Sequence, residues 1–477
     1  MGKLRSCVLA VVCTGMLLFS AVPMSALPVA QDDEPDCVDG WASLASVAFP
    51  GKIRVWATCT DAYEEDLREM LGIVESLWEP MTEFMEIEPL PDEGNAAAGG
   101  DSAIDFYLVD QEIGVPQRGS GPPAARSFGY SRAAAPFVGV ANSAFVVMRR
   151  NMLGDPQFTD TLAHEFFHVL QQARNGQLGF KWDIRPDDDP DWDTLVFAEQ
   201  WWTEATAEWA AFHFTREMPW QDDLRLIGHQ ERFSYFLDYA ASIPLHAPQQ
   251  RGESGWAYMY STYIWFYFME QEVGPEAIAE IWKAFGELEP GTVQQATAII
   301  DAELPFQEHF RDFAVRNLNL ALEPGDPIDP DYADLDPQFP GGDVSPPLLV
   351  GGTDADAWLP VAAENEDPRR YADRLRSLTA HYYRFLPDPQ GGKLILDFSR
   401  LAPAGDLDVD ALVEIEGRAW ERRRLQTGSA TTLCLSAPGD DVEEFYLVLS
   451  NHNRDLFSVV EGDFTAQVLA EPCGQEN

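Results

Sequence analysis

The sequence predicts an α+β protein with three successive parts: a mixed sheet with helices, a mainly helical part, and an antiparallel β-sandwich. Three observations predict this order. From residue 37 to about 175, short β-branched and aromatic runs alternate with segments of helical period. Within 176–322, apolar residues recur at helical spacing almost throughout from about residue 195. After a stretch rich in Pro and Asp at 323–347, residues 348–477 change to a period of two, as in half-buried strands.

The composition indicates a globular protein with an acidic surface. Of 477 residues, 45% are hydrophobic and 12% aromatic, which is enough for substantial cores in roughly two to four domains. The chain has 79 Asp and Glu against 32 Lys and Arg, a formal charge of -47 at pH 7. Such a surface repels nucleic-acid phosphates and anionic lipids, so we expect neither nucleic acid nor a membrane surface as a partner.

Residues 1–26 have the pattern of a secretory signal peptide. Lys3 and Arg5 precede an apolar run from Cys7 to Val22, and small residues follow that run. The alternative is an uncleaved anchor, because the cleavage pattern is imperfect. No later segment reaches the roughly 20 apolar residues that a membrane-spanning helix requires. We therefore expect a secreted protein that leaves the membrane after the signal peptide is removed.

Residues 37–175 are expected to form the α+β part. Ile53–Thr58 and Ile104–Val109 are short runs rich in β-branched and aromatic residues, and Phe137–Met148 is predicted to form one or two further strands. Between the first two runs, residues 61–86 carry apolar side chains at helical spacing and are predicted to form a helix. A last helix is predicted within 159–173, with Thr159 or Asp160 as its cap.

Residues 176–322 are predicted to form the helical part, which is almost entirely helical from about residue 195. Candidate helices span 197–215, 222–240, 256–272, 275–287 and 305–320. The third of these is apolar on most sides, which predicts that it is buried within a helical layer. Residues 323–347 have few apolar anchors and are interpreted as an extended linker at a domain boundary.

Residues 348–477 are predicted to form the antiparallel sandwich, with roughly six to eight strands. The candidate strands are Thr379–Phe385, Lys393–Phe398, Leu412–Ile415, Thr432–Leu435, Phe445–Ser450 and Phe464–Leu469. Nothing in these strands indicates whether the sandwich binds matrix, carbohydrate or the preceding part of the chain.

Four cysteines remain outside the signal peptide. They form one close pair near each end, so we expect Cys37 to bond Cys59 and Cys434 to bond Cys473 in an exported chain. Four cysteines permit three pairings, and the sequence alone does not choose among them. A structural zinc site is the alternative, although such a site usually has closer Cys-x-x-Cys spacing.

The motif with the clearest chemistry is His-Glu-x-x-His, at His164, Glu165 and His168. On a helix, positions i and i+4 lie on one face, so the two imidazoles can bind one metal ion while Glu165 lies near the open coordination position. The apolar residues around the motif recur at helical spacing. The alternative is a core helix with two incidental histidines.

A catalytic zinc needs three protein ligands and a water, and the predicted helix at 197–215 offers a third ligand. Glu204 and Glu208 lie four residues apart in an aromatic and alanine-rich segment, where carboxylates are costly unless a cation meets them. We assign Glu204 as the third metal ligand. Glu208 is expected to accept the second N–H of a ligating imidazole. For each, the alternative is an ordinary solvated carboxylate.

With these residues the sequence resembles the gluzincins, which are zinc metallopeptidases with His-Glu-x-x-His on one helix and a Glu on a following helix. The resemblance covers roughly residues 50–320 and is specific at His164, Glu165, His168 and the segment 202–209. It looks most like secreted bacterial members with a β-sandwich behind a zincin-like catalytic unit. The 36-residue step from His168 to Glu204 is longer than in the thermolysin-like branch. Subfamily and substrate preference therefore stay open.

The resemblance implies a mechanism with Zn²⁺ as the cofactor. Zinc acidifies its water and polarises the scissile carbonyl, while Glu165 takes the proton of the water and passes it to the leaving amine. Tyr260 occupies a place where related peptidases often bring a Tyr or His, so we nominate it as the donor to the oxyanion. The alternative for Tyr260 is core packing on a buried aromatic helix.

The remaining polar residues give weaker signals. His213 lies about half a turn from the face of Glu204 and is not expected to join the same metal. Five further histidines are expected at the surface or at helix caps: His229, His246, His309, His381 and His452. The acidic loop 187–193 offers oxygen ligands for Ca²⁺, but a solvated loop explains it as well, because it lacks the pattern of an EF-hand loop.

The sequence therefore predicts a secreted zinc-dependent peptidase, and an endopeptidase in particular. Its peptide or protein substrate is expected to lie along an edge strand within Phe137–Met148, where strand addition satisfies the peptide backbone. The alternative is an exported, non-catalytic binding or cell-surface protein on a metalloprotease-like scaffold. Hydrolysis of a non-peptide amide is a third interpretation. The sequence does not indicate the oligomeric state.

Overall fold

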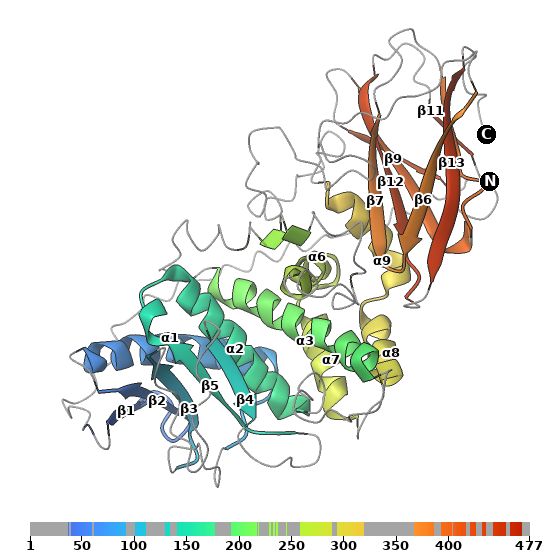
Figure 1. Cartoon of the computed structure of the whole chain (residues 1–477). Helices are drawn as coiled ribbons and strands as arrows, with labels where there is room; N and C mark the ends of the chain where they lie inside the picture. The colour runs from blue at the N-terminus through green and yellow to red at the C-terminus, as the bar shows by residue number, and fades with distance from the viewer. Residues whose placement is uncertain are drawn as a thin grey trace, which may run out of the picture.

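The computed structural model has the predicted order of parts, with a mixed sheet and helices followed by antiparallel sheets (Figure 1). The residues that it describes are 37, 40–59, 62–91, 101–110, 129–133, 141–176, 192–216, 218, 229, 232–233, 235–236, 245, 258–288, 293–318, 367–385, 393–402, 404–415, 420–425, 432–435, 442–454 and 458–469. The predicted signal peptide, the linker at 323–347 and the acidic residues 187–191 lie outside these ranges.

The first part is built on a five-stranded mixed sheet. Its strands are β1 (Trp41–Ala45), β2 (Ile53–Thr58), β3 (Ile104–Val109), β4 (Gly129–Ala133) and β5 (Ala144–Arg149), in the spatial order β1-β2-β3-β5-β4. The pairs β2·β3 and β3·β5 are parallel, whereas β1·β2 and β4·β5 are antiparallel. The sequence prediction of β2 and β3 is confirmed at both ends, whereas β1 and β4 were not predicted.

The prediction of an edge strand within Phe137–Met148 is wrong for the part that the structure describes. β5 lies between β3 and β4, and all of Ala144–Met148 is buried. An unbroken apolar run is typical of a strand that is covered on both faces, so this run indicated an interior strand. The described edge on this side of the sheet is β4, whose sequence Gly-Tyr-Ser-Arg-Ala lacks that apolar pattern.

Two long helices cover one face of this sheet: α1 (Tyr63–Phe84) and α2 (Pro156–Asn175). α2 begins three residues earlier than predicted. Asp155 accepts a hydrogen bond from the Gln157 N–H at 2.9 Å, and Pro156 fits the first helical position because it has no N–H to leave unpaired. Asp160, proposed as a cap, instead accepts a hydrogen bond from the Thr215 hydroxyl at 2.7 Å.

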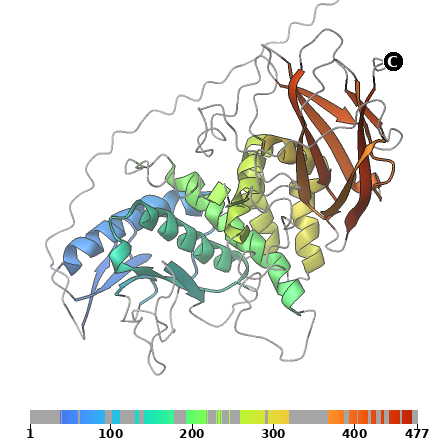
Figure 2. The same cartoon turned by 45° about the horizontal axis from the view of Figure 1, so that its top comes forward.

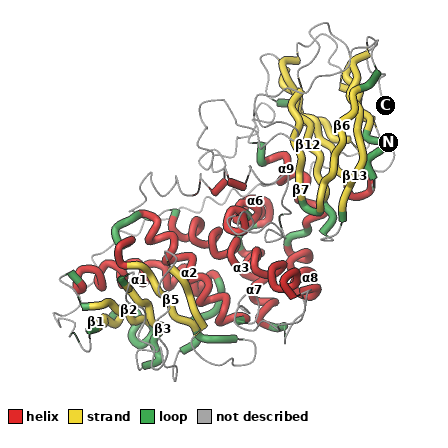
Figure 3. Tube along the Cα trace, viewed as in Figure 1, coloured by secondary structure: helices red, strands yellow, loops and turns green. Residues whose placement is uncertain are grey.

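The helical part packs against α2 on the side away from the sheet (Figure 3). Its described helices are α3 (Trp192–Thr215), α6 (Tyr263–Val273), α7 (Glu276–Gly286), α8 (Val293–Glu303) and α9 (Phe306–Arg316). Every residue from Tyr263 to Met269 is buried, which confirms the predicted buried helix. A separate helical turn at 258–261 precedes α6. α8 was not predicted, and of the predicted helix at 222–240 only residues 229, 232, 233, 235 and 236 are described, all of them helical.

The last part consists of two four-stranded antiparallel sheets. Figures 1 and 2 show their strands, in orange and red, together at one end of the molecule. The strands are β6 (Arg369–Arg376), β7 (Thr379–Phe385), β8 (Lys393–Asp397), β9 (Leu407–Ile415), β10 (Glu421–Leu425), β11 (Thr432–Leu435), β12 (Val442–Asn451) and β13 (Val459–Leu469). The sheet orders are β10-β9-β12-β7 and β11-β8-β13-β6, and one hydrophobic cluster draws side chains from both sheets. The strands β6 and β10, rich in Arg, were not predicted.

The antiparallel sheets are joined to the helical part through α9. Ala314, Val315 and Leu318 form one buried cluster with residues of β7, β9 and β12. Beside it, Arg311 Nε lies 2.7 Å from Asp410 Oδ2, and the Asp410 side chain is only 1% exposed. A buried carboxylate is costly without a charged partner, so this ion pair fixes α9 on the sheet.

The predicted pairing of Cys37 with Cys59 is confirmed by a disulfide that ties the entry of β1 to the end of β2. Cys434 is also disulfide-bonded. Its predicted partner, Cys473, lies outside the described residues. Among the described residues, no helix combines the length and apolar character needed to cross a bilayer.

Gly462 in β13 provides a test of the packing between this strand and the turn that follows β8. Its φ is +152°, and a Cβ atom there would lie 2.0 Å from the carbonyl oxygen of Arg400. We expect Gly462→Ala to lower the free energy of unfolding by about 1–3 kcal/mol, because both strain and overlap must be relieved. Urea unfolding of the full chain measures this loss.

The matched control is Gly405→Ala, since a Cβ atom at Gly405 meets nothing within 4 Å. We expect this change to alter the free energy of unfolding by less than about 0.5 kcal/mol. Equal unfolding curves for the two variants would contradict the tight contact at Gly462.

Candidate metal centre

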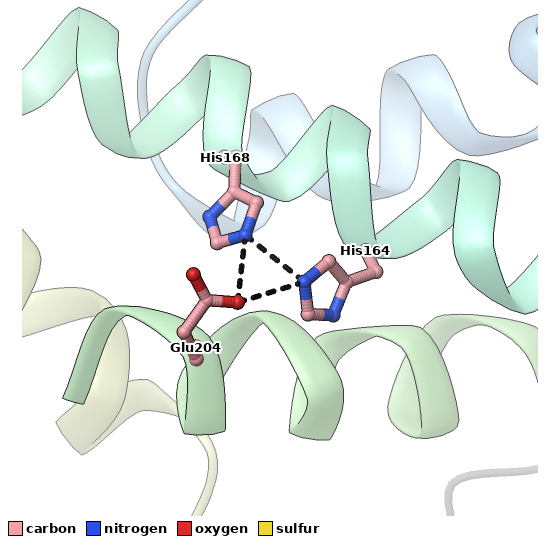
Figure 4. Close-up of side chains that lie close together, drawn as sticks. All are labelled: His164, His168 and Glu204. Atoms are coloured by element: carbon pink, nitrogen blue, oxygen red, sulfur yellow. Dashed lines mark hydrogen bonds and ion pairs between the residues drawn. The ribbon is translucent and has the colours of Figure 1, made fainter. Parts of the chain in front are cut away.

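The packing of α2 against α3 brings three predicted ligands together (Figure 4). His164 and His168 project from one face of α2, and Glu204 projects from the facing side of α3. The Nε2 atoms of the two histidines are 2.9 Å apart, and Glu204 Oε2 lies 3.3 Å from His164 Nε2 and 3.4 Å from His168 Nε2. We call these three residues the ligand cluster.

The dimensions of the ligand cluster fit a small divalent cation. Ligands at about 2.0–2.1 Å from a tetrahedral zinc lie roughly 3.3 Å from one another, close to the three distances in the cluster. A search of the described residues for three or more His, Cys, Asp or Glu side chains that could share one ion finds this cluster, whose ligand atoms all lie within 4.8 Å of one another. The two Nε2 atoms face each other at 2.9 Å, so either one of them carries a proton and donates it to the other, or both present lone pairs to a shared cation.

Behind the ligand cluster, Glu208 faces His164. The Oε2 atom of Glu208 lies 3.3 Å from His164 Nδ1, on the side of the ring away from the cluster, and its side chain is 3% exposed. Arg232 forms an ion pair with the other oxygen of this carboxylate. His229 Nε2 lies 3.3 Å from Asp160 Oδ2, and its Nδ1 lies 3.9 Å from Glu208 Oε1. Glu208 thus has the position in which an acceptor can orient a ligating imidazole.

Gln171 faces the second imidazole and was missed in the sequence analysis. Its Oε1 atom lies 2.7 Å from His168 Nδ1, and the residue is fully buried. The Nε2 atom of the same side chain donates to the Thr203 carbonyl at 3.1 Å and to Thr206 Oγ1 at 2.9 Å. A glutamine three residues after a histidine carries no signature of its own. The sequence offered one indication of this role: Gln171 lies three residues after His168 and is therefore a polar residue on the same face of the helix.

The electrostatics of the site favour a positive charge at the ligand cluster. Burial disfavours a charged imidazole at His164, but Glu204, Glu208 and Glu165 outweigh burial and raise the pKa of His164 to about 10. Burial also raises the pKa of the Glu204 carboxyl, but the charges of His168 and His164 outweigh it and hold this pKa well below its usual range. With neutral imidazoles, these three carboxylates and Arg232 leave two negative charges, which a divalent cation neutralises.

The two predicted catalytic side chains lie beside the ligand cluster. Glu165 is 8% exposed, and its charge raises the pKa of His164. The ring of Tyr260 lies 5.8 Å from the ring of His164, measured between centroids. The charge of Glu204 and burial raise the pKa of Tyr260 well above its ordinary value. The Tyr260 hydroxyl therefore keeps its proton at neutral pH and can act as a hydrogen-bond donor.

The other histidines differ in part from the sequence analysis. His213 stays outside the ligand cluster, as expected, and its Nδ1 lies 2.9 Å from Glu270 Oε1. The prediction that His229 and His381 lie at the surface or at helix caps is wrong. His229 is 1% exposed, and His381 is 6% exposed with Asp373 as its partner. Both are buried because a carboxylate lies beside each of them, which single histidines in a sequence do not reveal.

His452 and His309 are partly buried, and His452 Nδ1 lies 2.7 Å from Asp408 Oδ2. His246 lies outside the described residues, as do the acidic residues 187–191 of the loop considered for calcium. Calcium binding by that loop stays a prediction.

Comparisons with known proteins add little to this geometry. No protein-family model matches the chain, and no curated protein matches its sequence. Among solved structures, the chain is similar to an M1 zinc metallopeptidase from Deinococcus radiodurans, with a TM-score of 0.28 and 13% sequence identity. The similarity covers 53% of this chain and 44% of that structure. A likeness this slight carries no argument about function, so the site is interpreted from its own residues.

The geometry of the ligand cluster predicts that the protein binds zinc, which metal analysis can test. We expect the protein to bind about one zinc ion per chain, and Glu204→Ala to lose this stoichiometric zinc, because two imidazoles alone leave the site one ligand short. Metal analysis after dialysis against zinc-free buffer measures both. Glu270→Gln is the control, since Glu270 is also a largely buried carboxylate beside a histidine, with a side chain 10% exposed, but lies outside the ligand cluster. Zinc retained by Glu204→Ala would remove Glu204 from the ligand set.

Proposed function

We propose that this protein is an exported zinc-dependent peptidase. One observation carries the proposal: His164, His168 and Glu204 converge from two helices, and Glu165 and Tyr260 lie beside them. The ligand cluster uses three protein side chains, which leaves a tetrahedral ion one position for water or substrate. Three protein ligands with an open position are typical of catalytic zinc, whereas structural zinc usually has four.

The chemistry follows from the residue types around the ligand cluster. A zinc ion bound there would supply a Lewis acid that polarises a carbonyl group and acidifies a water. Glu165 accepts a proton from the attacking water as the new C–O bond forms, and it delivers that proton to the amine nitrogen as the C–N bond breaks. The Tyr260 hydroxyl donates a hydrogen bond to the negative charge that develops on the carbonyl oxygen.

The backbone of β4 supports a peptide as the substrate. β4 is the end strand of the five-stranded sheet as described, and it packs next to α2, the helix that carries the motif. An extended peptide can add to such an edge through main-chain hydrogen bonds, which do not select particular side chains. The proposal therefore transfers the predicted substrate edge from the interior β5 to β4 and favours endopeptidase activity.

Export is supported by the Cys37–Cys59 disulfide and by the signal-like residues 1–26. Disulfides persist mainly in oxidising compartments, so this bridge favours a secreted protein. The acidic composition supports a protein substrate over nucleic acid or a membrane surface.

The direct test of the mechanism is Glu165→Gln. The amide keeps the size of the carboxylate but cannot accept the proton of the water, so we expect zinc binding to persist and hydrolysis of a mixed peptide library to fall by at least about 100-fold. Mass spectrometry of the products and metal analysis of the same samples give both readouts. A variant that still cleaves peptides would reject Glu165 as the base. A parent that binds zinc but cleaves no peptide would favour the non-catalytic alternative.

Tyr260→Phe tests the proposed hydrogen-bond donor. Removal of the hydroxyl is expected to lower kcat by about 100-fold with little change in KM, because the bond forms in the transition state. Steady-state kinetics on one cleaved peptide measure the two constants separately.

Tyr263→Phe is the matched control, since the Tyr263 hydroxyl donates to the His229 carbonyl at 3.3 Å instead of facing the ligand cluster. We expect its kcat to stay within a few-fold of that of the parent. If both tyrosine variants lose activity equally, the loss reflects packing of the helical layer and Tyr260 has no special role.

A further inference from the structure

We propose that Gln171 is the positioning residue of His168: it accepts the Nδ1–H of this imidazole and thereby aims the Nε2 lone pair at the metal. The proposal rests on the proposed function, because it assigns a role around the same zinc ion. Its observations are a 2.7 Å contact between Gln171 Oε1 and His168 Nδ1, and the complete burial of Gln171.

The hydrogen bonds around Gln171 fix which way its amide points. The Thr203 carbonyl can only accept, so the amide nitrogen must face it, at 3.1 Å. The Thr206 hydroxyl donates its proton to the Trp202 carbonyl at 2.7 Å, so its lone pair faces the amide nitrogen at 2.9 Å. The amide oxygen is therefore turned toward His168, and an oxygen can only accept. His168 Nδ1 must then carry the proton, which leaves Nε2 free to bind a metal.

The same argument explains why an amide is suited to position 171. The side chain must accept at one end and donate to a carbonyl at the other, both inside a fully buried space. A carboxylate would accept from His168 but would face the Thr203 carbonyl oxygen with a second acceptor. A carboxylate would also add a negative charge to a site in which Glu165, Glu204, Glu208 and Arg232 already match a divalent ion.

Gln171 also links the two helices that supply the ligands. Its amide oxygen faces an imidazole of α2, while its amide nitrogen holds the backbone of Thr203, the residue immediately before Glu204 on α3. A shift of α3 along α2 would break the bond to the Thr203 carbonyl, because Gln171 and His168 lie on the same helix. Gln171 thus helps to set the position of Glu204 relative to His168 from outside the ligand cluster.

The neighbouring Gln172 provides a contrast within the same helix. It is 1% exposed, yet neither its side-chain oxygen nor its nitrogen has a hydrogen-bond partner in the described part of the chain. Two adjacent buried glutamines therefore differ in their contacts, with Gln171 alone of the two bonded to a predicted ligand.

The test compares zinc affinity in three variants of the full chain, measured by competition with a chromophoric chelator. Gln171→Met keeps the length of the side chain but removes both hydrogen-bonding ends, and we expect it to bind zinc about 10- to 100-fold more weakly than the parent. Gln171→Glu restores the acceptor alone and is expected to bind zinc at least about tenfold more tightly than Gln171→Met. Gln172→Met should match the parent.

Two results with these variants would overturn the proposal. One is parent-like zinc affinity in Gln171→Met. The other is Gln171→Glu binding zinc no better than Gln171→Met, because a purely structural link to Thr203 is lost in both variants. Zinc affinity is measured without turnover. A parent that binds zinc but cleaves no peptide would therefore reject the proposed peptidase activity, while the affinities of the variants would still test the role of Gln171. A parent that binds no zinc rejects the proposed function and this role together.

A measurement on the parent protein covers the case in which Gln171→Met does not fold. Nitrogen NMR of histidine-labelled, zinc-free protein reports which ring nitrogen of His168 carries a proton. We expect protonated Nδ1 at neutral pH, since Gln171 Oε1 accepts from it. An unprotonated Nδ1 would reject the proposal even if the protein bound zinc and cleaved peptides.

Discussion

The packing of α2 against α3 is the contact on which the rest of the structure depends. Both helices are largely apolar on the faces that meet, yet His164, His168 and Glu204 lie between them. These polar groups would be costly in such a place if they did not meet one another and a cation. The sheet packs against α2, and the aromatic layer around α6 packs against α3, so the two helices are held together from both sides. The fold therefore acts as a rigid support for one buried polar cluster.

Each imidazole of that cluster has a polar side chain behind it. His164 faces Glu208, whose carboxylate pairs with Arg232, while His168 faces the uncharged Gln171. The two imidazoles therefore lie in different electrostatic surroundings, one beside an ion pair and one beside an amide. A carboxylate behind an imidazole strengthens it as a ligand more than an amide does. In the proposed zinc site, this difference would make His164 the stronger donor of the two imidazoles.

The sequence predicted the parts of the fold and site that have a local signature. Apolar runs identified β2 and β3, and spacing of four residues placed His164 and His168 on one helix face. The missed features depend on partners that are distant in the sequence. β10 contains Arg422, Arg423 and Arg424 and is stabilised by pairing with β9 and by Asp410 and Asp312, which no local pattern shows. The contacts of Gln171 depend on α3, and the burial of His229 depends on Asp160. The interior position of β5 depends on β4, which pairs with its outer side.

The position of α9 has a consequence for how the chain unfolds. One face of this helix, with Phe306, Phe310 and Phe313, belongs to the core that supports the ligand cluster, while Ala314 and Val315 belong to the cluster shared with the antiparallel sheets. A helix shared between two cores cannot leave one of them without exposing apolar surface of the other. The antiparallel sheets are therefore coupled to the helical layer in folding cooperativity, and a protease cut in the chain between them would not by itself release a self-sufficient module.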